Sequence, residues 1–467
     1  MSQEKYRIKG SFRDPLGAVY EQDGRIFRTV QKNKSQEFEK ILNQQFLKNW
    51  VHSKKFIETT KISNSQTPDF LKSDDRCCVY EHPKLDFISY PYEWCYAQLR
   101  DAAIFFLKLQ LEALEHGVVF KDSSAYNIQF IGPNPIFIDA LSLRPYVPNE
   151  YWQGYYQFCK EFLYPILLSY YNNVPPSVFY RGNIHGIDAA LASKLLPLRS
   201  RSSLWVNIHV HMNAASNTRS AIRKRSSFDK NSYVFLLKSL LKFISKLEKP
   251  TTRTIWGDYT NLTSYAEEDM QKKTTFVKQF IEENKIRSLI DLGCNDGFYS
   301  QLAFDSQNNG NNLFVVGVDG DEEAIIKCYQ AAKLRQVNLT NLKIDLMSPS
   351  PSTGFMCEER VSLLHRQSFD ASLALALIHH LIIGCGANME GAVRFLTSFS
   401  RIGVVEFVEK EDLRVQQMLK HREDVFTRYD ITNFTNTLSH VCEISGQKQI
   451  SKHRHLFSFR RRQPRRA

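Results

Sequence analysis

The sequence lacks the signals of several protein classes. It has no uninterrupted apolar run of the roughly 18 residues that a membrane-spanning helix needs, and its first residues (MSQEKYRIKG) contain no apolar stretch of the kind found in secretory signals. The nine cysteines are odd in number, scattered and never spaced as CxxC, which argues against a disulfide framework and against a structural zinc site. We therefore expect a cytoplasmic protein with reduced thiols and no structural metal.

Acidic residues are scarce in two segments of the chain. The net charge is +12, but residues 199–253 contain 12 Lys/Arg and 2 Asp/Glu, and residues 452–467 contain 7 Lys/Arg and no acid. No zinc-finger, recognition-helix or RNP-type motif accompanies these charges, so no specific nucleic-acid partner is expected. The tail predicts at most a weak contact with anionic surfaces, and a solvated end is the alternative.

The length of 467 residues, with 43% apolar and 24% charged residues, predicts a globular protein with about two domains. The patterns described below divide it into four segments. We expect an α+β accessory domain (1–198), a basic linker with a bridging helix (199–253), an α/β domain (254–451) and a basic tail continuing from the last strand (452–467). The sequence carries no signal for an oligomeric state.

The first half shows short strands and apolar-faced helices. Asp23-Gly24 can adopt the positive φ of a tight hairpin turn. Apolar spacing predicts helices over residues 35–55 and 101–116, the second ended by Gly117. Short β-rich runs follow at 118–120, 128–131 and 136–138.

The second half alternates strands with helices, which predicts a doubly wound, mostly parallel sheet covered on both faces. The expected strands are residues 288–292, 313–318, 341–346, 369–377 and 402–408, with 442–449 and 455–460 as the last two.

A glycine-containing turn and a series of acids follow these strands. The turn is Asp291-Leu-Gly-Cys-Asn-Asp-Gly297, and Asp319 and Asp345 end the next two strands. Parallel strands present their ligand contacts at their carboxyl ends. Asp319 could instead cap the following helix, Asp345 could cap a turn, and Asp370 reads as a structural turn residue.

These motifs resemble those of class I S-adenosylmethionine-dependent methyltransferases over residues ~276–410. The middle glycine of the family's turn is Asn295 here, and Asn is the residue that best tolerates the left-handed conformation after glycine. The G-x-G-x-x-G of a dinucleotide-binding dehydrogenase-like fold is absent. The resemblance implies S-adenosylmethionine as cofactor, Asp291 near its ammonium, Asp319 on its ribose and Asp345 at its adenine. The cofactor-binding set it implies is Asp291, Gly293, Cys294, Asn295, Gly297, Asp319, Gly320, Asp345 and Leu346.

Two histidines, His379 and His380, stand where the fourth strand is expected to stop, beside the transferable methyl in folds of this type. Either could be the base that an acceptor hydroxyl or amide needs, or both could orient the following loop. Glu406 and Glu409 could line the acceptor pocket or be solvated. An Asn/Asp-Pro-Pro-Tyr clamp is absent, which disfavours methylation of DNA adenine or glutamine. Trp256, Tyr259 and Tyr265 could form a lid or pack between domains.

A second constellation lies in the first half. Asp122, Asn127 and Asp139 have the order of the catalytic loop and metal-binding Asp of kinase-like folds, and Arg28 stands where a phosphate-binding Lys is expected. That resemblance implies Mg and ATP only if the fold is an active kinase. No His precedes Lys121-Asp122, and Ala-Leu follows Asp139. A degenerate binding module and an unrelated α+β domain remain alternatives.

The function predicted is methyl transfer to O or N of a small molecule or glycan precursor. The chain as a whole resembles bacterial methyltransferases of the nodulation and polysaccharide-decoration type, and the long N-terminal extension suits that resemblance. The alternatives are a bifunctional kinase-like and methyltransferase protein, and a non-catalytic cofactor-binding scaffold, which the intact turn and ribose acid disfavour.

Overall fold

The computed structural model describes residues 3–14, 16–72, 77–217, 228–249, 266–306, 313–421 and 423–462. The chain divides into two compact units. Unit 1 is Met1–Pro250 together with Ser352–Arg360, and unit 2 is Thr251–Pro351 together with Val361–Ala467. We call Ser352–Arg360 the arm, because it belongs to unit 1 although the chain on both sides of it belongs to unit 2. No helix in the described ranges combines the length and the apolar character that a membrane crossing requires.

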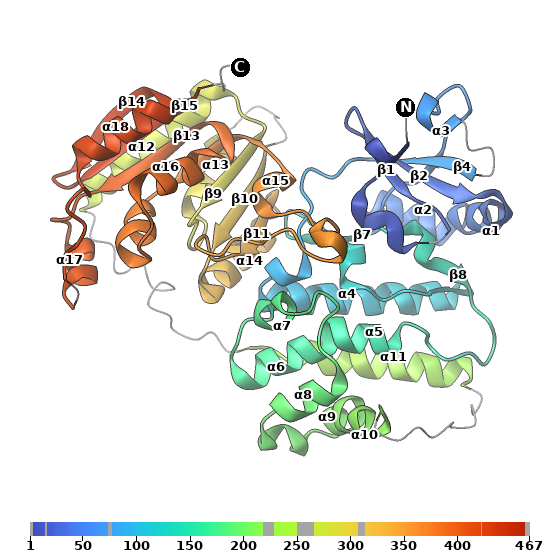
Figure 1. Ribbon diagram of the computed structural model, residues 1–467. Coiled ribbons are helices and arrows are strands. Elements are labelled where there is room, and N and C mark those ends of the chain that lie inside the picture. The colour runs from blue at the N-terminus through green and yellow to red at the C-terminus, as the bar shows by residue number, and fades with distance from the viewer. Residues whose placement is uncertain are drawn as a thin grey trace. The chain divides into compact units, whose positions relative to one another are not determined.

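Unit 1 begins with a four-stranded antiparallel sheet in the order β1-β2-β4-β3 (Figure 1). Its strands are β1 (Val19–Gln22), β2 (Arg25–Gln31), β3 (Thr60–Lys61) and β4 (Cys77–His82). Asp23 and Gly24 have φ of 50° and 76°, so the predicted hairpin is confirmed, with the left-handed pair that its tight turn requires.

The single helix predicted over residues 35–55 is wrong, because the structure has two. They are α1 (Lys32–Leu42) and α2 (Gln45–His52), separated by Gln44, which is extended at ψ 142°. The apolar spacing continues across the break, so the sequence hides it. The break lets Phe38 of α1 and Trp50 of α2 both be buried.

The rest of unit 1 is mainly helical, and helices α4 to α11 lie on the far side of β7 from β1 and β2, whereas α3 lies beside the sheet (Figure 1). The predicted helix starts earlier than expected, as α4 (Tyr96–Glu115), and Gly117 follows it with φ 73°. Two ribbons pair β5 (Val118–Phe120) with β8 (Leu143–Pro145) and β6 (Ile128–Ile131) with β7 (Asn134–Phe137). The further helices are α3 (Asp69–Lys72), α5 (Tyr155–Phe158), α6 (Tyr164–Asn172), α7 (Ser177–Arg181) and α8 (Ala189–Leu195).

Within the segment predicted as a basic linker with a bridging helix, residues 199–217 and 228–249 are largely helical and belong to unit 1. Helix α11 (Lys230–Ser245) packs along α4, where the Tyr96 hydroxyl donates to the Leu247 carbonyl (2.8 Å) and Gln110 donates to the Tyr233 hydroxyl (2.8 Å). On α11 the side chains of Lys238 and Lys242 are exposed, whereas Tyr233, Leu237, Leu240 and Ile244 are buried. The preceding helices are η7 (Leu198–Ser202), α9 (Leu204–Val206), η8 (Asn207–Met212) and α10 (Asn213–Asn217).

Unit 2 contains a seven-stranded sheet in the order β11-β10-β9-β12-β13-β15-β14. The first five strands of that order run parallel, and β15 and β14 are antiparallel. The α/β prediction for this half is therefore confirmed. The strands are β9 (Ser288–Leu292), β10 (Phe314–Asp319), β11 (Leu339–Lys343), β12 (Phe369–Ala374), β13 (Ser400–Val408), β14 (Cys442–Ser451) and β15 (Arg454–Arg461).

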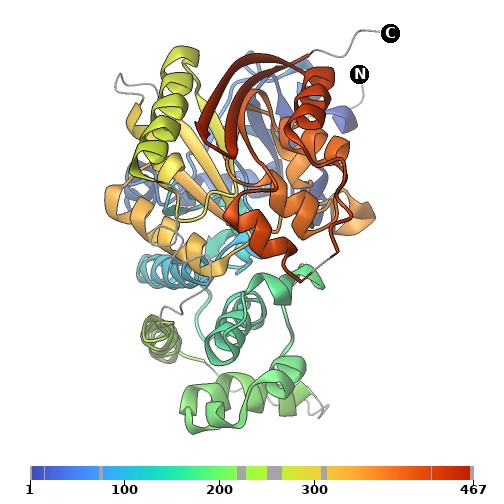
Figure 2. The ribbon, with the colours of Figure 1, turned by 90° about the vertical axis from the view of Figure 1, so that its left-hand side faces the viewer.

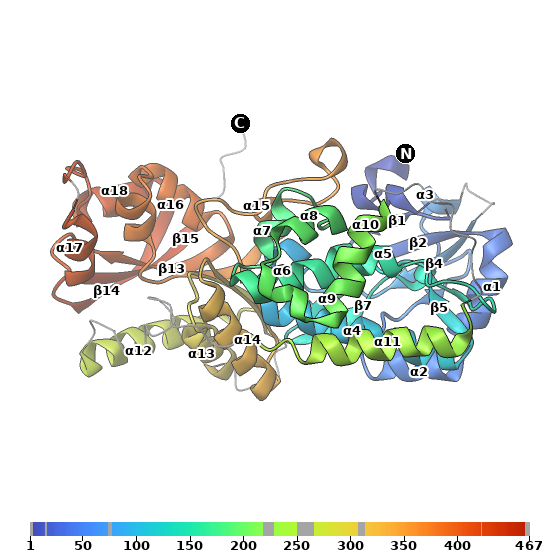
Figure 3. The same cartoon turned by 90° about the horizontal axis from the view of Figure 1, so that it is seen from below.

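Helices cover both faces of this sheet. Figures 2 and 3 show α12 (Glu267–Asn284) and α13 (Phe298–Ser306) on one face, and α16 (Met389–Thr397) and α18 (Ile431–Val441) on the other. The remaining helices are α14 (Glu322–Arg335), α15 (Leu363–Arg366) and α17 (Leu413–Leu419). Because β9, β10, β11 and β12 are parallel neighbours, their carboxyl ends meet at one edge, where the predicted cofactor residues lie.

Candidate functional site

The turn after β9 has the left-handed backbone that the sequence predicted. Gly293, Asn295 and Gly297 have φ of 75°, 52° and 85°. The N–H groups of Gly293 and Cys294 both donate to the Val318 carbonyl (2.8 and 3.0 Å), which ties the turn to β10. A Cβ on Gly297 would lie 2.2 Å from Cys328 Sγ, so the last glycine is required by packing as well as by φ.

Asp319, at the end of β10, holds this turn from its other side. Its two carboxylate oxygens accept the N–H of Asn295 (2.9 Å) and of Asp321 (2.8 Å). Asp319 does not cap the following helix, because Asp321 does so by accepting the N–H groups of Glu323 and Ala324. Each oxygen retains a lone pair, so the half-buried carboxylate can accept two further hydrogen bonds.

Asp291 lies beneath the turn and is 2% exposed. The Ser300 hydroxyl of α13 donates to it (2.6 Å). Burial raises the pKa of Asp291 to about 6, against the opposing effect of Ser300.

The remaining predicted cofactor residues surround the same edge. Gly320 is exposed, and a Cβ on it would meet only backbone atoms of residues 344 and 345, at 3.8 Å or more. Asp345 is exposed and accepts the Met347 N–H (2.9 Å), which is the turn-capping role foreseen as its alternative. Cys294 and Leu346 are buried. Asp370 lies at the opposite edge and accepts the N–H groups of Arg287 and Ser288, as a structural turn residue would.

The two histidines lie beyond β12, which ends at Ala374 rather than at residue 377. Ala376 has φ 49° and breaks the strand, and His380 opens the short helix η11 (His380–Gly384). Strand alternation therefore does not separate their side chains, and the rings lie 4.1 Å apart. His379 is 2% exposed, and its Nδ1 has no hydrogen-bond partner among the described residues. Burial lowers the pKa of both, that of His380 to about 4.

A buried charge network that the sequence did not reveal lies in unit 2. Lys273 of α12 pairs with Glu406 of β13 (2.7 Å), and Arg454 of β15 pairs with both Glu406 (3.5 Å) and Asp412 (2.7 Å). Glu406 is fully buried, so it does not line an open pocket. These partners are far apart in sequence, and only the fold brings them together.

Glu409, the second acid predicted near the acceptor, is held by two histidines. His453 Nδ1 and His455 Nε2 lie 3.2 and 2.9 Å from its carboxylate oxygens. Trp256, Tyr259 and Tyr265, the candidate lid, lie outside the described residues.

The predicted constellation in unit 1 comes together in part. Arg28 of β2 lies 2.9 Å from Asp139 and 3.7 Å from Asp14. Burial and the neighbouring charge of Asp139 raise the pKa of Asp122. The Ile138 N–H donates to the Asn127 carbonyl (2.8 Å), which joins the two ends of the motif.

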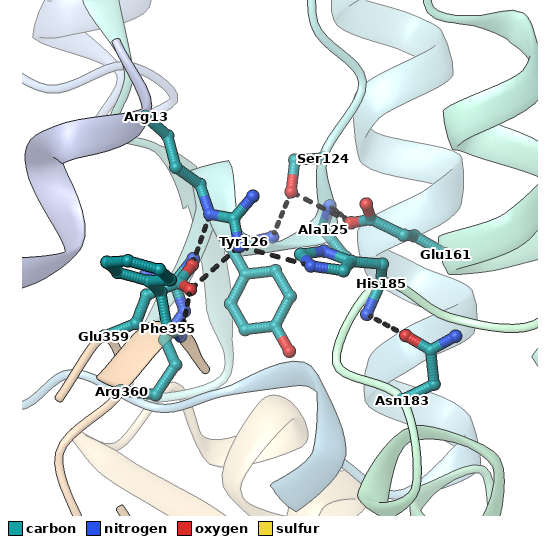
Figure 4. Close-up of polar contacts among 10 residues, drawn as sticks. All are labelled: Arg13, Ser124, Ala125, Tyr126, Glu161, Asn183, His185, Phe355, Glu359 and Arg360. Atoms are coloured by element: carbon teal, nitrogen blue, oxygen red, sulfur yellow. Dashed lines mark hydrogen bonds and ion pairs between the residues drawn. The ribbon is translucent and has the colours of Figure 1, made fainter. Parts of the chain in front are cut away.

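The buried carboxylate of Glu161 holds the loop between Asp122 and Asn127 in place. Glu161 accepts the Ser124 hydroxyl (2.9 Å) and the Ala125 N–H (2.8 Å) (Figure 4). Burial raises the pKa of Glu161 to about 7, against the effect of these two donors.

The arm contacts the same loop from another side (Figure 4). Glu359 accepts two hydrogen bonds from Arg13 (2.5 and 2.8 Å) and one from the Phe355 N–H (3.1 Å). The Arg360 guanidinium lies 4.2 Å from the centre of the Tyr126 ring, within the range of a cation–π contact. No sequence pattern predicts this contact, which joins residues more than 200 positions apart.

The doubly wound sheet, its glycine turn and the acid ending its second strand define unit 2 as a Rossmann-like α/β unit. No protein-family model matches the chain. It is 34% identical over 465 residues to the nodulation protein NoeA of Rhizobium meliloti (strain 1021), covering 97% of this chain and 96% of that protein. The chain therefore belongs to the NoeA family, and the match extends over both units.

Solved structures similar to the chain include methyltransferases. One is a SAM-dependent methyltransferase from Aquifex aeolicus (12% identity, TM-score 0.29, covering 44% of this chain and 98% of that one). Another is the methyltransferase domain of bacterial CtHen1-C (14% identity, TM-score 0.30, covering 41% and 98%). A third is the bifunctional kinase-methyltransferase WbdD (14% identity, TM-score 0.31, covering 48% and 46%).

Proposed function

We propose that the protein is an S-adenosylmethionine-dependent methyltransferase that acts on an oxygen or nitrogen of a small molecule or a glycan precursor. One observation carries the proposal: Asp319 ends the second strand and is bonded to the N–H of Asn295 in the left-handed turn after the first strand. In this arrangement the Asp319 carboxylate, which accepts hydrogen bonds through both oxygens, lies beside the glycine-containing turn at the carboxyl edge of the sheet. The name of the similar nodulation protein supports a role in nodulation, and it names no methyl acceptor.

The residues present fit this cofactor. The buried Oδ1 of Asn295 has no hydrogen-bond partner among the described residues, and the space beside Gly320 is bounded only by backbone. Asp319 would accept the ribose hydroxyls, and Asp291 would balance the ammonium through water. Asp345 and Leu346 would border the adenine. The cofactor supplies an electrophilic methyl with a good leaving group, so positioning of the acceptor provides much of the acceleration.

Proton removal from the acceptor is assigned to His380 in this proposal. Its side chain is half-buried, whereas His379 is almost inaccessible. Burial, with the charge of Arg454, lowers the pKa of His380 to about 4. The ring is therefore neutral at pH 7 and can accept a proton. A base this weak suits an acceptor that is partly activated or already nucleophilic.

A bifunctional protein is the second candidate function, and the geometry around Asp139 favours it. An antiparallel sheet carries Arg28 to within 2.9 Å of Asp139, whose charge in turn acts on Asp122. In a kinase-like unit, Asp139 and Asn127 would hold magnesium and Asp122 would orient an acceptor hydroxyl. A non-catalytic cofactor-binding scaffold is the remaining alternative.

The proposed function is tested by methyl transfer from cofactor labelled in its methyl group into a bacterial cell extract fractionated by size and polarity. We expect label in a small or glycan-like fraction. Asp319→Asn should lose most of it, because hydrogen bonds to a charged acceptor contribute about 1.5–3 kcal/mol each. Asp370→Asn is the matched control, since that carboxylate also accepts two backbone N–H groups but at the opposite edge. No labelled fraction with the wild-type protein, despite measurable cofactor binding, would favour the scaffold.

A further inference from the structure

A small cationic pocket lies in unit 1, and none of the residues predicted for either site lines it. Helices α8 and α10 with η7 and η8 surround it, and its volume is about 430 Å³. These helices lie together at the end of unit 1 farthest from its sheet (Figures 1 and 3). The lining residues are Ala190, Ser193, Lys194, Arg201, Asn207, His211, Ala214 and Ala215.

The pocket has hydrogen-bond donors and no acid in its lining. Neither Lys194 nor Arg201 has an ion-pair partner within the described ranges. His211 Nδ1 lies 2.7 Å from the Ser193 hydroxyl, and its buried Nε2 has no hydrogen-bond partner in the described part of the chain. When Ser193 donates to Nδ1, the neutral ring carries its hydrogen on Nε2 and offers it to a ligand. Two cations and an imidazole N–H are donors of the kind that a phosphate group needs.

The surface around this pocket is unusually apolar. Leu198, Leu204 and Met212 are 80%, 65% and 57% exposed, and Leu191 and Leu195 of α8 are also exposed. Exposed apolar side chains concentrated in one region mark an interaction surface. Because the pocket among them is lined by two cations and no acid, the partner that they fit is apolar and negatively charged, which describes the interface of an anionic lipid bilayer.

We propose that this end of unit 1 docks on an anionic membrane surface, with the pocket binding a phospholipid phosphate and the surrounding apolar side chains entering the headgroup region. The docking is independent of methyl transfer, and it would bring the protein to acceptors or products held at a membrane.

Cosedimentation of the full chain with vesicles tests the proposal. We expect binding to vesicles of mixed phosphatidylcholine and phosphatidylglycerol, and little to phosphatidylcholine alone. The double variant Lys194→Gln with Arg201→Gln should weaken binding roughly 30-fold, since each cation near such a surface contributes about 1 kcal/mol. Leu195→Asn with Leu198→Asn should also weaken it, and should make the remaining binding more sensitive to salt.

The matched control is Lys238→Gln with Lys242→Gln, on the exposed face of α11. It removes the same number of charges from unit 1 and should retain most of the binding. Equal losses in the two double variants would show unspecific charge attraction and overturn the proposal. Binding of soluble glycerol phosphate that depends on Lys194 and Arg201, without vesicle binding, would assign the pocket to a soluble ligand instead. A dimer that Leu198→Asn dissociates, again without vesicle binding, would assign the surface to a second copy.

Discussion

Asn295 stands where the turn of class I methyltransferases, which this turn resembles, has its middle glycine. The φ of 52° at Asn295 explains why Asn can replace that glycine. Asn is the side chain that best tolerates this region after glycine. Its N–H reaches Asp319, so the departure preserves the link between the first two strands. At the scale of single residues, the sequence therefore predicted the geometry of the turn from residue type alone.

We expect substitutions of His380 and His379 to have different effects. His380→Ala should retain cofactor affinity while methyl transfer falls by about 10²–10⁴-fold, the usual contribution of a general base. His379→Ala should mainly lower the stability of unit 2, because that ring is buried. Calorimetric titration of cofactor beside labelled-methyl turnover separates the two effects. Because the pKa of His380 lies at about 4, wild-type turnover should show no loss between neutral pH and pH 5. Normal turnover in both variants would mean that proximity alone activates the acceptor.

Asp291 makes the stability of unit 2 depend on pH. Burial raises its pKa from 3.8 to about 6, so the folded state binds more protons than the unfolded state between these values. The free energy of unfolding must then fall as pH rises through that window, by on the order of 3 kcal/mol. Asp291→Asn should remove this loss, measured by hydrogen exchange in β9 at pH 4 and pH 7. Ser300→Ala, which deletes a bond that lowers this pKa, should move the loss to higher pH. The same slope in the Asn variant would contradict the assignment.

Secondary-structure elements were predictable where a local pattern defines them. Strand β9 has the predicted bounds, since five buried residues lie between polar Arg287 and the glycine turn. The predicted end of β12 lies three residues too far along the chain, because the apolar run continues past Ala374. Nothing in the sequence marks the left-handed conformation of Ala376. The helix over residues 35–55 failed for the same reason. Where a break in regular structure is enforced by tertiary packing, the apolar spacing of the chain does not record it.

The arm is the element that no local pattern could place, and it yields a prediction. Burial raises the pKa of Glu359, but Arg13, the Phe355 N–H and Arg360 together outweigh it, so the pKa lies below its usual value. Glu359→Gln should weaken arm docking by about 1.5–3 kcal/mol, the contribution of hydrogen bonds to charged groups. Hydrogen exchange at the Phe355 amide measures it.

Glu358→Gln is the control for the arm. Glu358 pairs with Lys9 at 3.4 Å, and both side chains are more than half exposed, so its loss should cost at most about 1 kcal/mol. Equal exchange in the two variants would show that the ion pair with Arg13 does not hold the arm.

At the scale of the whole molecule, the sequence predicted a separate candidate site in each half of the chain. It did not predict the long-range contacts that hold each unit together. The strand-end acids of unit 2 could be predicted because a parallel sheet collects residues that follow successive strands. The pairing of Glu406 with Lys273 and Arg454 could not, because it joins the helix α12 to strands that follow more than 100 residues later. Removing one partner of such a buried network leaves an uncompensated charge, which makes the network a structural tie for unit 2.

The two units should respond to different ligands, and a comparison of two variants tests this in the full chain. S-adenosylmethionine should slow hydrogen exchange in the turn at residues 293–297 and at the end of β10, because a ligand that binds only the folded state stabilises it by RT ln(1 + [L]/Kd). Asp319→Asn should abolish this protection and Asp139→Asn should leave it intact. Magnesium with ATP should protect residues 122–127 if unit 1 holds a nucleotide, and there the effects of the two variants should be reversed. Protection of residues 122–127 that survives Asp139→Asn would rule out a metal role for that carboxylate. Protection absent at millimolar ATP would leave unit 1 as a module without nucleotide chemistry, while the response to S-adenosylmethionine continues to test unit 2 separately.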